Sequence, residues 1–530
     1  MKHDLRPLAP HEVRAMLADG GELALIDLRE ELIFSRGHLL HARSIPLSRL
    51  ELNFARLVPR LDTRIVLCDE ADGLAERAAA VLASAGYEDL FALAGGAAAW
   101  AGTGLELFSG VNVPSKAFGE LVEHACATPS ISADELHQMM RAGRDLVVLD
   151  SRPFDEYRRI SIPTGVNVPG AELVLRVRDA APSPDTLVVV NCAGRTRSII
   201  GAQSLRNAGV PNRVVALRNG TMGWSLAGHQ CDSGQNRRVP HVSAAALSWA
   251  RSASDALARR FAVPRIDREK LDTLRRDRTR TLYLFDVRNP EEYEAGHFPG
   301  ALSAPGGQLV QATDQYVGTL GARVVLSDDL EVRALMTASW LRQMGWKDVF
   351  VLAEAGNETG QPAAHILGPA LPRELSLDCA ELAELIARNA ATVVDLSLSR
   401  EYRKAHIPGA WFAIRSRLPA ALKKIPLQGT LALTSEDGAL ASLAVREAAS
   451  PANAPARYLS GGNAAWRAAG RPLIADETRM ADEPVDMWLK PYERGTDTQN
   501  AMREYLAWEV DLLSRIERDG SAGFTLGSGA

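Results

Sequence analysis

A chain of 530 residues is too long for one hydrophobic core and indicates about three to four domains. Its 46% hydrophobic and 24% charged residues are typical of soluble globular proteins, and its net charge of −5 provides no general attraction to nucleic acid or membranes. The sequence lacks an apolar run long enough to span a bilayer and lacks the apolar core of a signal peptide, so we expect a cytoplasmic protein. Its five cysteines lie far apart without a C-x-x-C pair, which argues against disulfides and a zinc site and predicts reduced thiols.

One pattern occurs four times along the chain. Each copy begins with an apolar strand that ends in Asp27, Asp150, Asp286 or Asp395, and an aromatic residue follows seven positions later. A proline turn and a second apolar strand come next. A third strand then leads into a glycine turn and a helix, which carries a tryptophan in three of the copies. Strands that alternate with helical segments predict a central, mostly parallel sheet flanked by helices in every copy.

The repeat predicts an α/β protein of four tandem domains with a helical C-terminal tail. We expect the domains at residues 1–108, 128–230, 264–369 and 370–476, a linker at 109–127, a helical linker at 231–263 and the tail at 477–530. The helical linker should contain a helix from Ala244 to Phe261, and we interpret the basic stretch after it as solvated surface rather than a nucleic-acid patch. The aromatic residues of the tail predict a helix that docks onto its own protein or a symmetry mate, and residues 520–530 are expected to be disordered.

The second copy carries the most informative motif, between an apolar strand and a helical segment. Backbone N–H groups of such a loop can converge on an anion, and the helix dipole adds positive potential. Arg195 and Arg197 are expected to lower the pKa of Cys192, whose thiolate is the reactive form. We therefore expect Cys192 to be a sulfur nucleophile and Ser198 to cap the following helix. The predicted catalytic and anion-binding loop consists of Cys192, Ala193, Gly194, Arg195, Thr196, Arg197 and Ser198.

With these motifs assembled, the chain resembles the rhodanese (thiosulfate sulfurtransferase) family in four tandem copies. The likeness rests on the strand-end aspartate with an arginine two positions later, on the sequence from Glu292 to Ala301, on the cysteine loop and on the Gly-Gly-x-x-x-Trp ending. The resemblance implies that Cys192 attacks the outer sulfur of thiosulfate or a similar anionic donor, releases sulfite and passes sulfur from its persulfide to a thiol or cyanide. Arg195 and Arg197 would bind the donor. Neither a metal nor an organic cofactor is implied.

The other three copies predict weak catalysis or none. Cys68 ends the second strand of the first copy, but the acidic residues after it would raise its pKa and repel an anionic donor, so we expect at most a secondary thiol there. The third and fourth copies have Ser327 and Ser435 at the positions that spacing assigns to the cysteine. A serine cannot form a persulfide, so these two domains are expected to be inactive and to be structural or to bind a partner.

Three alternatives stay open at this point. The donor could be a mercapto acid, although the basic loop favours thiosulfate. The chain could instead be a persulfide carrier or a redox-sensing scaffold that presents Cys192 to a partner protein. A phosphatase fits less well, because Arg197 is the fifth residue after the cysteine rather than the sixth.

Overall fold

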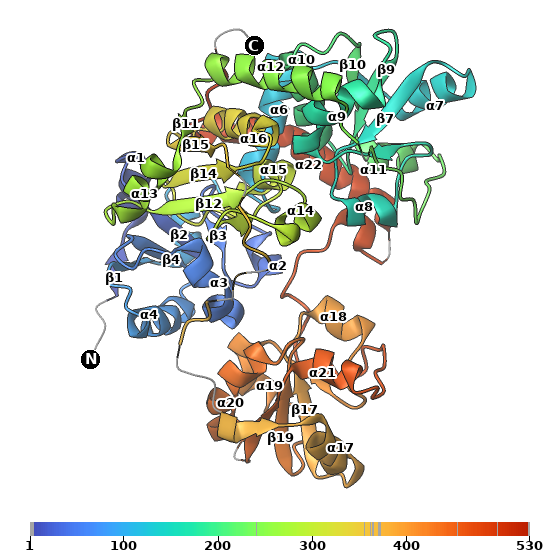
Figure 1. The fold of residues 1–530 in the computed structure, drawn as a ribbon. Coiled ribbons are helices and arrows are strands. Elements are labelled where there is room, and N and C mark those ends of the chain that lie inside the picture. Colours follow the sequence, from blue (N-terminus) through green and yellow to red (C-terminus); the bar gives the residue numbers. More distant parts are fainter. Residues whose placement is uncertain are drawn as a thin grey trace.

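The computed structural model describes residues 5–527, apart from residues 240, 355, 361, 363–364, 369–372, 453 and 496. It contains four five-stranded sheets, one for each repeat, and the named strands pair in parallel. This confirms the predicted α/β architecture of four tandem domains. In Figure 1 the fourth domain (orange) lies at one end of the molecule, away from the second domain (teal). The expected boundary between the third and fourth domains, at residues 369 and 370, lies outside the described residues.

The four domains share one order of elements along the chain. In the first domain these are β1 (Arg6–Leu8), α1 (Pro10–Ala18), β2 (Ala24–Asp27), α2 (Glu31–Phe34), β3 (Arg43–Ser44), α3 (Leu50–Leu57), β4 (Ile65–Cys68), α4 (Leu74–Ser84), β5 (Leu90–Leu93) and α5 (Gly96–Gly102). In the second they are β6 (Ser130–Ile131), α7 (Ala133–Arg141), β7 (Leu146–Asp150), α8 (Phe154–Arg159), β8 (Val166–Asn167), α9 (Leu173–Ala180), β9 (Leu187–Asn191), α10 (Thr196–Asn207), β10 (Val214–Leu217) and α11 (Gly220–Leu226).

The third and fourth domains follow the same order, except that the described part of the third domain has no helix after its last strand. The third contains β11 (Arg265–Ile266), α13 (Arg268–Arg276), β12 (Leu282–Asp286), α14 (Pro290–Ala295), β13 (Leu302–Ser303), α15 (Gly306–Gln311), β14 (Arg323–Ser327), α16 (Val332–Gln343) and β15 (Val349–Leu352). The fourth contains β16 (Ser376–Leu377), α17 (Cys379–Ala387), β17 (Ala391–Asp395), α18 (Ser399–Lys404), β18 (Trp411–Phe412), α19 (Leu418–Ala421), β19 (Thr430–Thr434), α20 (Ala439–Ala452), β20 (Ala456–Leu459) and α21 (Gly462–Ala468).

Each sheet places its longest strands at the centre. In the second domain the strand order is β6-β10-β9-β7-β8, and the three valines of β9 are buried. Strands buried on both faces need helices on both sides, which explains the continuous apolar runs in the sequence. The strand-end Asp150 forms an ion pair with Arg152 at 2.6 Å, and both side chains are buried. The same ion pair at 2.6 Å joins Asp27 to Arg29 and Asp286 to Arg288.

Three α-helices in the described part of the chain lie outside the four domains: α6 (Val113–Ala125), α12 (Ala244–Arg260) and α22 (Thr498–Asp519). The first, α6, lies in the segment expected to be a linker and packs against α10 and α22, while α12 packs against α9 and α16. The helices α12 and α22 confirm the two helices predicted for the helical linker and the tail. None of the helices in the described part of the chain is both long and apolar enough to cross a bilayer.

The end of the tail is ordered further than expected. Phe524 packs against Phe118 of α6, with 5.2 Å between ring centroids, and the Thr525 N–H donates to the Gln343 carbonyl over 2.8 Å. The prediction of disorder from residue 520 onward is therefore wrong up to residue 527. The reason is that an aromatic residue among small ones is enough to attach this segment to the core between the second and third domains.

Candidate functional site

Cys192 lies directly after the central strand β9, at the start of the loop that leads into α10. The carboxyl end of a parallel strand and the N-terminus of a helix meet there, which brings backbone N–H groups around the thiol. The Cys192 side chain is 2% exposed, and its thiol donates a hydrogen bond to the Ser198 hydroxyl over 3.5 Å. Ser198 in turn donates to the Arg195 carbonyl over 2.7 Å. Because α10 begins at Thr196, Ser198 lies inside its first turn, and the expectation that it caps the helix is wrong.

Arg197 is the arginine of the loop whose charge acts on the Cys192 thiol. Its guanidinium donates to the Glu156 carboxylate over 2.9 Å and to the Gln308 side-chain oxygen of the third domain over 3.0 Å. Lys490 of the tail donates to the same carboxylate over 2.9 Å. Together these two cations hold the pKa of Glu156 far below its usual value, so the group carries a charge.

Arg195 forms ion pairs with α6 instead. Its guanidinium forms two hydrogen bonds of 2.7 Å with Glu120 of α6 and a further ion pair with Glu123 on the same helix. It also donates to the Asn219 side-chain oxygen over 3.2 Å. Arg195 lines the cavity next to the thiol, but its charge is neutralised by these carboxylates. Its main structural effect is to attach α6 to the Cys192 loop (residues 192–198).

The pKa of Cys192 is shifted upward rather than downward. Burial is the largest cause, and the Glu509 carboxylate acts in the same direction. The Arg197 charge and hydrogen bonds with the Ser198 hydroxyl and backbone N–H lower the pKa, but burial outweighs them. The expectation that two arginines lower the pKa of this thiol is therefore wrong for the net shift, because one of them is paired elsewhere and the thiol is buried.

Cys68 does not occupy the position of Cys192. The strand register pairs Cys68 with Asp27, whereas the equivalent aspartate of the second domain pairs with Asn191. Cys68 thus corresponds to Asn191, and Asp69 corresponds to Cys192. The Cys68 side chain is fully buried within the sheet, and burial together with Asp27 raises its pKa well above the usual value. The position that spacing assigned to Cys68 is therefore wrong by one residue. Cys68 ends strand β4, whereas the residue equivalent to Cys192 begins the loop after that strand.

The loops of two other domains hold carboxylates where Cys192 stands. Asp328 follows β14 in the third domain and accepts the N–H groups of Leu330 over 3.1 Å and of Arg333 over 2.7 Å. The Arg333 guanidinium forms an ion pair with it at 3.0 Å. Asp69 accepts two N–H groups of its own loop and helix in the first domain, over 2.8 and 3.1 Å. In these domains the loop therefore surrounds a negative charge at the position of Cys192.

A cavity of about 210 Å³ opens beside the Cys192 loop. Its walls come from four parts of the chain that are far apart in sequence. The lining side chains include Lys116 of α6, Gln308 and Gln311 of the third domain, and Trp488, Lys490, Tyr492, Tyr505 and Glu509 of the tail. Apart from the loop, sequence reasoning missed these residues as parts of a site. The aromatic spacing of the tail was the available signal, but it indicated docking and not the surface against which the tail docks.

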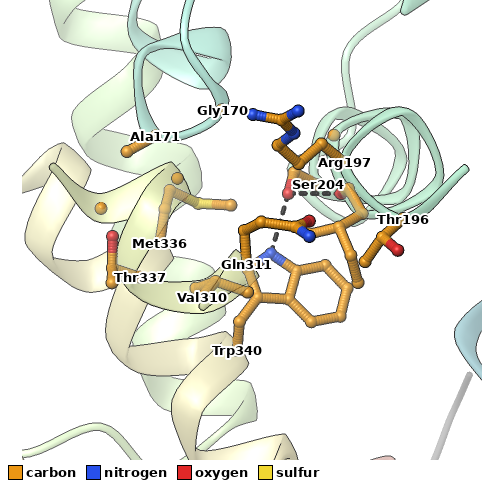
Figure 2. A pocket seen from close by; sticks show the side chains of 14 residues that line it. Gly170, Ala171, Thr196, Arg197, Ser204, Val310, Gln311, Met336, Thr337 and Trp340 are labelled. Carbon is orange, nitrogen blue, oxygen red and sulfur yellow. Dashed lines mark hydrogen bonds between the residues drawn. The ribbon is translucent and has the colours of Figure 1, made fainter. Parts of the chain in front are cut away.

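Behind the loop, α10 packs against the third domain around a small apolar cavity of about 30 Å³. Figure 2 shows Thr196, Arg197 and Ser204 of α10 opposite Trp340 of α16, with the Trp340 indole N–H donating to the Ser204 hydroxyl. That hydrogen bond is 2.8 Å long and buried. The third domain therefore supports the helix that begins at the Cys192 loop. Within the described residues, no group of three His, Cys, Asp or Glu side chains could hold a metal ion, and all five cysteines are free thiols.

Comparisons with known proteins agree with this architecture. A family model described as a rhodanese-like domain matches residues 9–103, 132–227, 267–357 and 378–469. The crystal structure of a thiosulfate sulfurtransferase from Pseudomonas aeruginosa is 47% identical, with a TM-score of 0.96 and a match that covers 99% of this chain and 100% of that chain.

Curated relatives match over single domains. A segment of 106 residues is 32% identical to an HTH-type transcriptional regulator from Mycobacterium tuberculosis, which covers 20% of this chain and 45% of that protein. A segment of 103 residues is 25% identical to a putative sulfur carrier protein from Bacillus subtilis, which covers 19% of this chain and 54% of that protein. The chain thus spans about half the length of these curated relatives. With a family model that matches each of its four sheets, the chain belongs to the rhodanese-like family and carries four copies of the domain in tandem.

Proposed function

We propose that this chain is a sulfurtransferase that takes a sulfane sulfur from thiosulfate, or a similar anionic donor, onto Cys192 and transfers it to a thiol or cyanide. The observation that carries this function is the position of the Cys192 thiol. It stands where the equivalent loops of two other domains hold the carboxylate of their own aspartate. The likeness to a thiosulfate sulfurtransferase along the whole chain supports the same function.

The first half-reaction would begin with loss of the Cys192 proton to solvent water. The thiolate attacks the outer sulfur of thiosulfate, a new S–S bond forms, and the old one breaks as sulfite leaves with its electron pair. The persulfide anion left on Cys192 is stabilised by N–H groups of the loop and by the Arg197 charge, in the way that Arg333 and its N–H hold Asp328. The pKa of Cys192 is raised in the free thiol, so Arg197 and the loop gain importance once negative charge develops on sulfur.

The other domains would support this centre rather than duplicate it. In the described loops of the first and third domains, a carboxylate occupies the position of the nucleophile, and Ser435 takes it in the fourth. The third domain contributes Gln308 and Gln311 to the cavity, and the tail contributes a cation, Lys490. Two cations near the thiol favour a small anionic donor. A reducing compartment such as the cytoplasm would keep the five free cysteines as thiols.

The test is intact-protein mass spectrometry after brief exposure to thiosulfate. We expect one added sulfur atom in the wild type and in Cys68→Ser, and none in Cys192→Ser. Sulfite should then be released repeatedly when a thiol or cyanide is supplied. Loading without repeated sulfite release would favour the alternative of a persulfide carrier that waits for a partner protein. Failure of the wild type to load would reject thiosulfate as the donor.

A further inference from the structure

Glu509 of α22 brings a buried carboxyl group into the Cys192 cavity, although α22 lies outside the four domains. The side chain is 2% exposed. Its Oε1 atom accepts hydrogen bonds from the Tyr505 hydroxyl over 2.9 Å and from the Thr196 hydroxyl over 3.5 Å. Its Oε2 atom is buried and has no hydrogen-bond partner among the described residues. A buried oxygen without a partner is costly, and such an atom beside a reaction centre calls for a function.

The position of Oε2 is set by the Cys192 loop. Gly194 lies against it so closely that a Cβ atom added there would be 3.1 Å from Oε2. The same carboxyl group is near enough to Cys192 to influence the pKa of the thiol. Glu509 and Cys192 line the same cavity, so a molecule bound there lies beside both groups.

Several charged groups face Glu509, and they come from each element packed against it. Tyr505 lies on the same helix, Lys116 and Glu120 on α6, and Arg195 on the Cys192 loop. Burial raises the pKa of Glu509, and Lys116 limits the rise. The Lys116 ammonium is itself buried among aromatic rings, and burial lowers its pKa to about 8. A carboxylate with a raised pKa is a stronger base than an ordinary one, which suits proton transfer near neutral pH.

The second half-reaction differs between acceptors in its need for a base. A thiol carries a proton near neutral pH and must lose it before it attacks the persulfide. A substantial fraction of sulfite is the dianion under the same conditions, and this form attacks without losing a proton. In the proposed function the loop and Arg197 stabilise negative charge on sulfur, and no residue has yet been named that accepts the proton of the thiol.

We propose that Glu509 is the general base that takes the proton from a thiol acceptor of the sulfane sulfur, a role that rests on the proposed function of Cys192. In this step the acceptor S–H bond breaks and its proton goes to the Glu509 carboxylate. The acceptor sulfur forms a bond to the terminal persulfide sulfur, and the bond from that sulfur to Cys192 breaks with its electron pair left on Cys192. The products are an acceptor persulfide anion, the Cys192 thiolate and a protonated Glu509. Tyr505 and Thr196 hold the other carboxylate oxygen in place.

The experiment compares the two acceptors on protein that already carries sulfur. Wild type, Glu509→Gln and the control Glu517→Gln, an exposed position on the same helix, are loaded with thiosulfate, and the added sulfur is verified by mass spectrometry. Single-turnover transfer is then measured to glutathione and to sulfite. We expect Glu509→Gln to slow transfer to glutathione by about 100-fold or more, the usual contribution of a general base, with transfer to sulfite close to the wild-type rate. Glutathione replaced by 4-nitrothiophenol, which is already ionised, should restore most of the lost rate.

The outcomes separate the two proposals. An equal loss of rate with glutathione and sulfite would show a purely structural role for Glu509 and overturn this inference, as would wild-type rates with both acceptors. If thiosulfate does not load Cys192, polysulfide replaces it as the donor, and the comparison proceeds on that loaded protein. A chain that neither donor loads would overturn the proposed function together with this inference.

Discussion

Gly220 sets the position of the Cys192 loop, and a single methyl group there tests the geometry of the site. Its φ is +54°, and an added Cβ would lie 2.3 Å from the Cys192 carbonyl oxygen. The next residue, Thr221, donates its N–H to that same oxygen over 2.8 Å. Ordinary contacts of a Cβ begin at 3.4 Å, so Gly220→Ala requires the loop to retreat by about 1 Å.

The expected loss follows from that distance. A displacement of about 1 Å at a reacting group costs about 100-fold in rate, and the left-handed φ adds about 1–2 kcal/mol of destabilisation for a residue with a Cβ. The assay is the rate of sulfur loading from thiosulfate, followed by mass spectrometry.

Gly462 provides the matched control for this substitution. It stands in the equivalent turn of the fourth domain with φ +57°, and an added Cβ would lie 1.9 Å from the Ser435 carbonyl oxygen. Gly462→Ala should reduce stability but retain loading, because the fourth domain has no cysteine in its loop. Loading by Gly220→Ala at the wild-type rate, or an equal loss in Gly462→Ala, would refute this account of the loop.

Two further predictions concern titration. Arg197→Met should raise the pKa of Cys192 further and slow its alkylation by iodoacetamide near neutral pH about tenfold, because Arg197 is the cation that opposes the effect of burial. Arg195→Met should leave the pH profile of alkylation unchanged and reduce stability instead, so equal shifts in the two variants would contradict the assignment. Burial lowers the pKa of His38 from 6.5 to about 4, so the stability it contributes is present above the unfolded pKa and is lost as the pH falls toward 4. The loss between roughly pH 7 and pH 5 should be about 2 kcal/mol in urea unfolding and should be smaller in His38→Phe; an unchanged pH dependence in that variant would contradict this.

The fold could be predicted because its signature is local. Asp150 and Arg152 form their ion pair two residues apart, so the structural reason for the repeat is visible in a short stretch of sequence. The same holds for the strand and helix periodicity of each copy. Four repetitions of a local pattern then predict four domains without any knowledge of how they pack.

The error at Cys68 shows where counting fails. Measured from the strand-end aspartate, Cys68 lies 41 residues on and Cys192 lies 42 residues on, which is within the variation of a loop. In a strand, a shift of one residue moves a side chain to the opposite face of the sheet. Only the pairing of strands distinguishes a cysteine that ends β4 from one that begins a loop.

The walls of the cavity could not be predicted, because they depend on packing between distant segments. Lys490 meets Glu156 across 334 residues, and Thr196 meets Glu509 across 313. Neither contact leaves a periodic trace in the sequence. The prediction of a lowered pKa for Cys192 failed for the same reason. Glu120 and Glu123 neutralise Arg195, and both lie on a helix in a segment that was expected to be a linker.

The third domain indicates why a loop without a thiol is useful to this chain. Arg333 is almost fully buried and forms ion pairs with Asp328 at 3.0 Å and with Glu172 of the second domain at 2.8 Å. A buried charge is tolerated only when it is paired, and Glu292 and Asp329 also form ion pairs with this guanidinium, at 2.8 and 2.6 Å. Asp328 provides a permanent charge where Cys192 would provide a reactive one. The loop of the third domain thereby links two domains and holds the wall of the cavity, including Gln308, against the second domain.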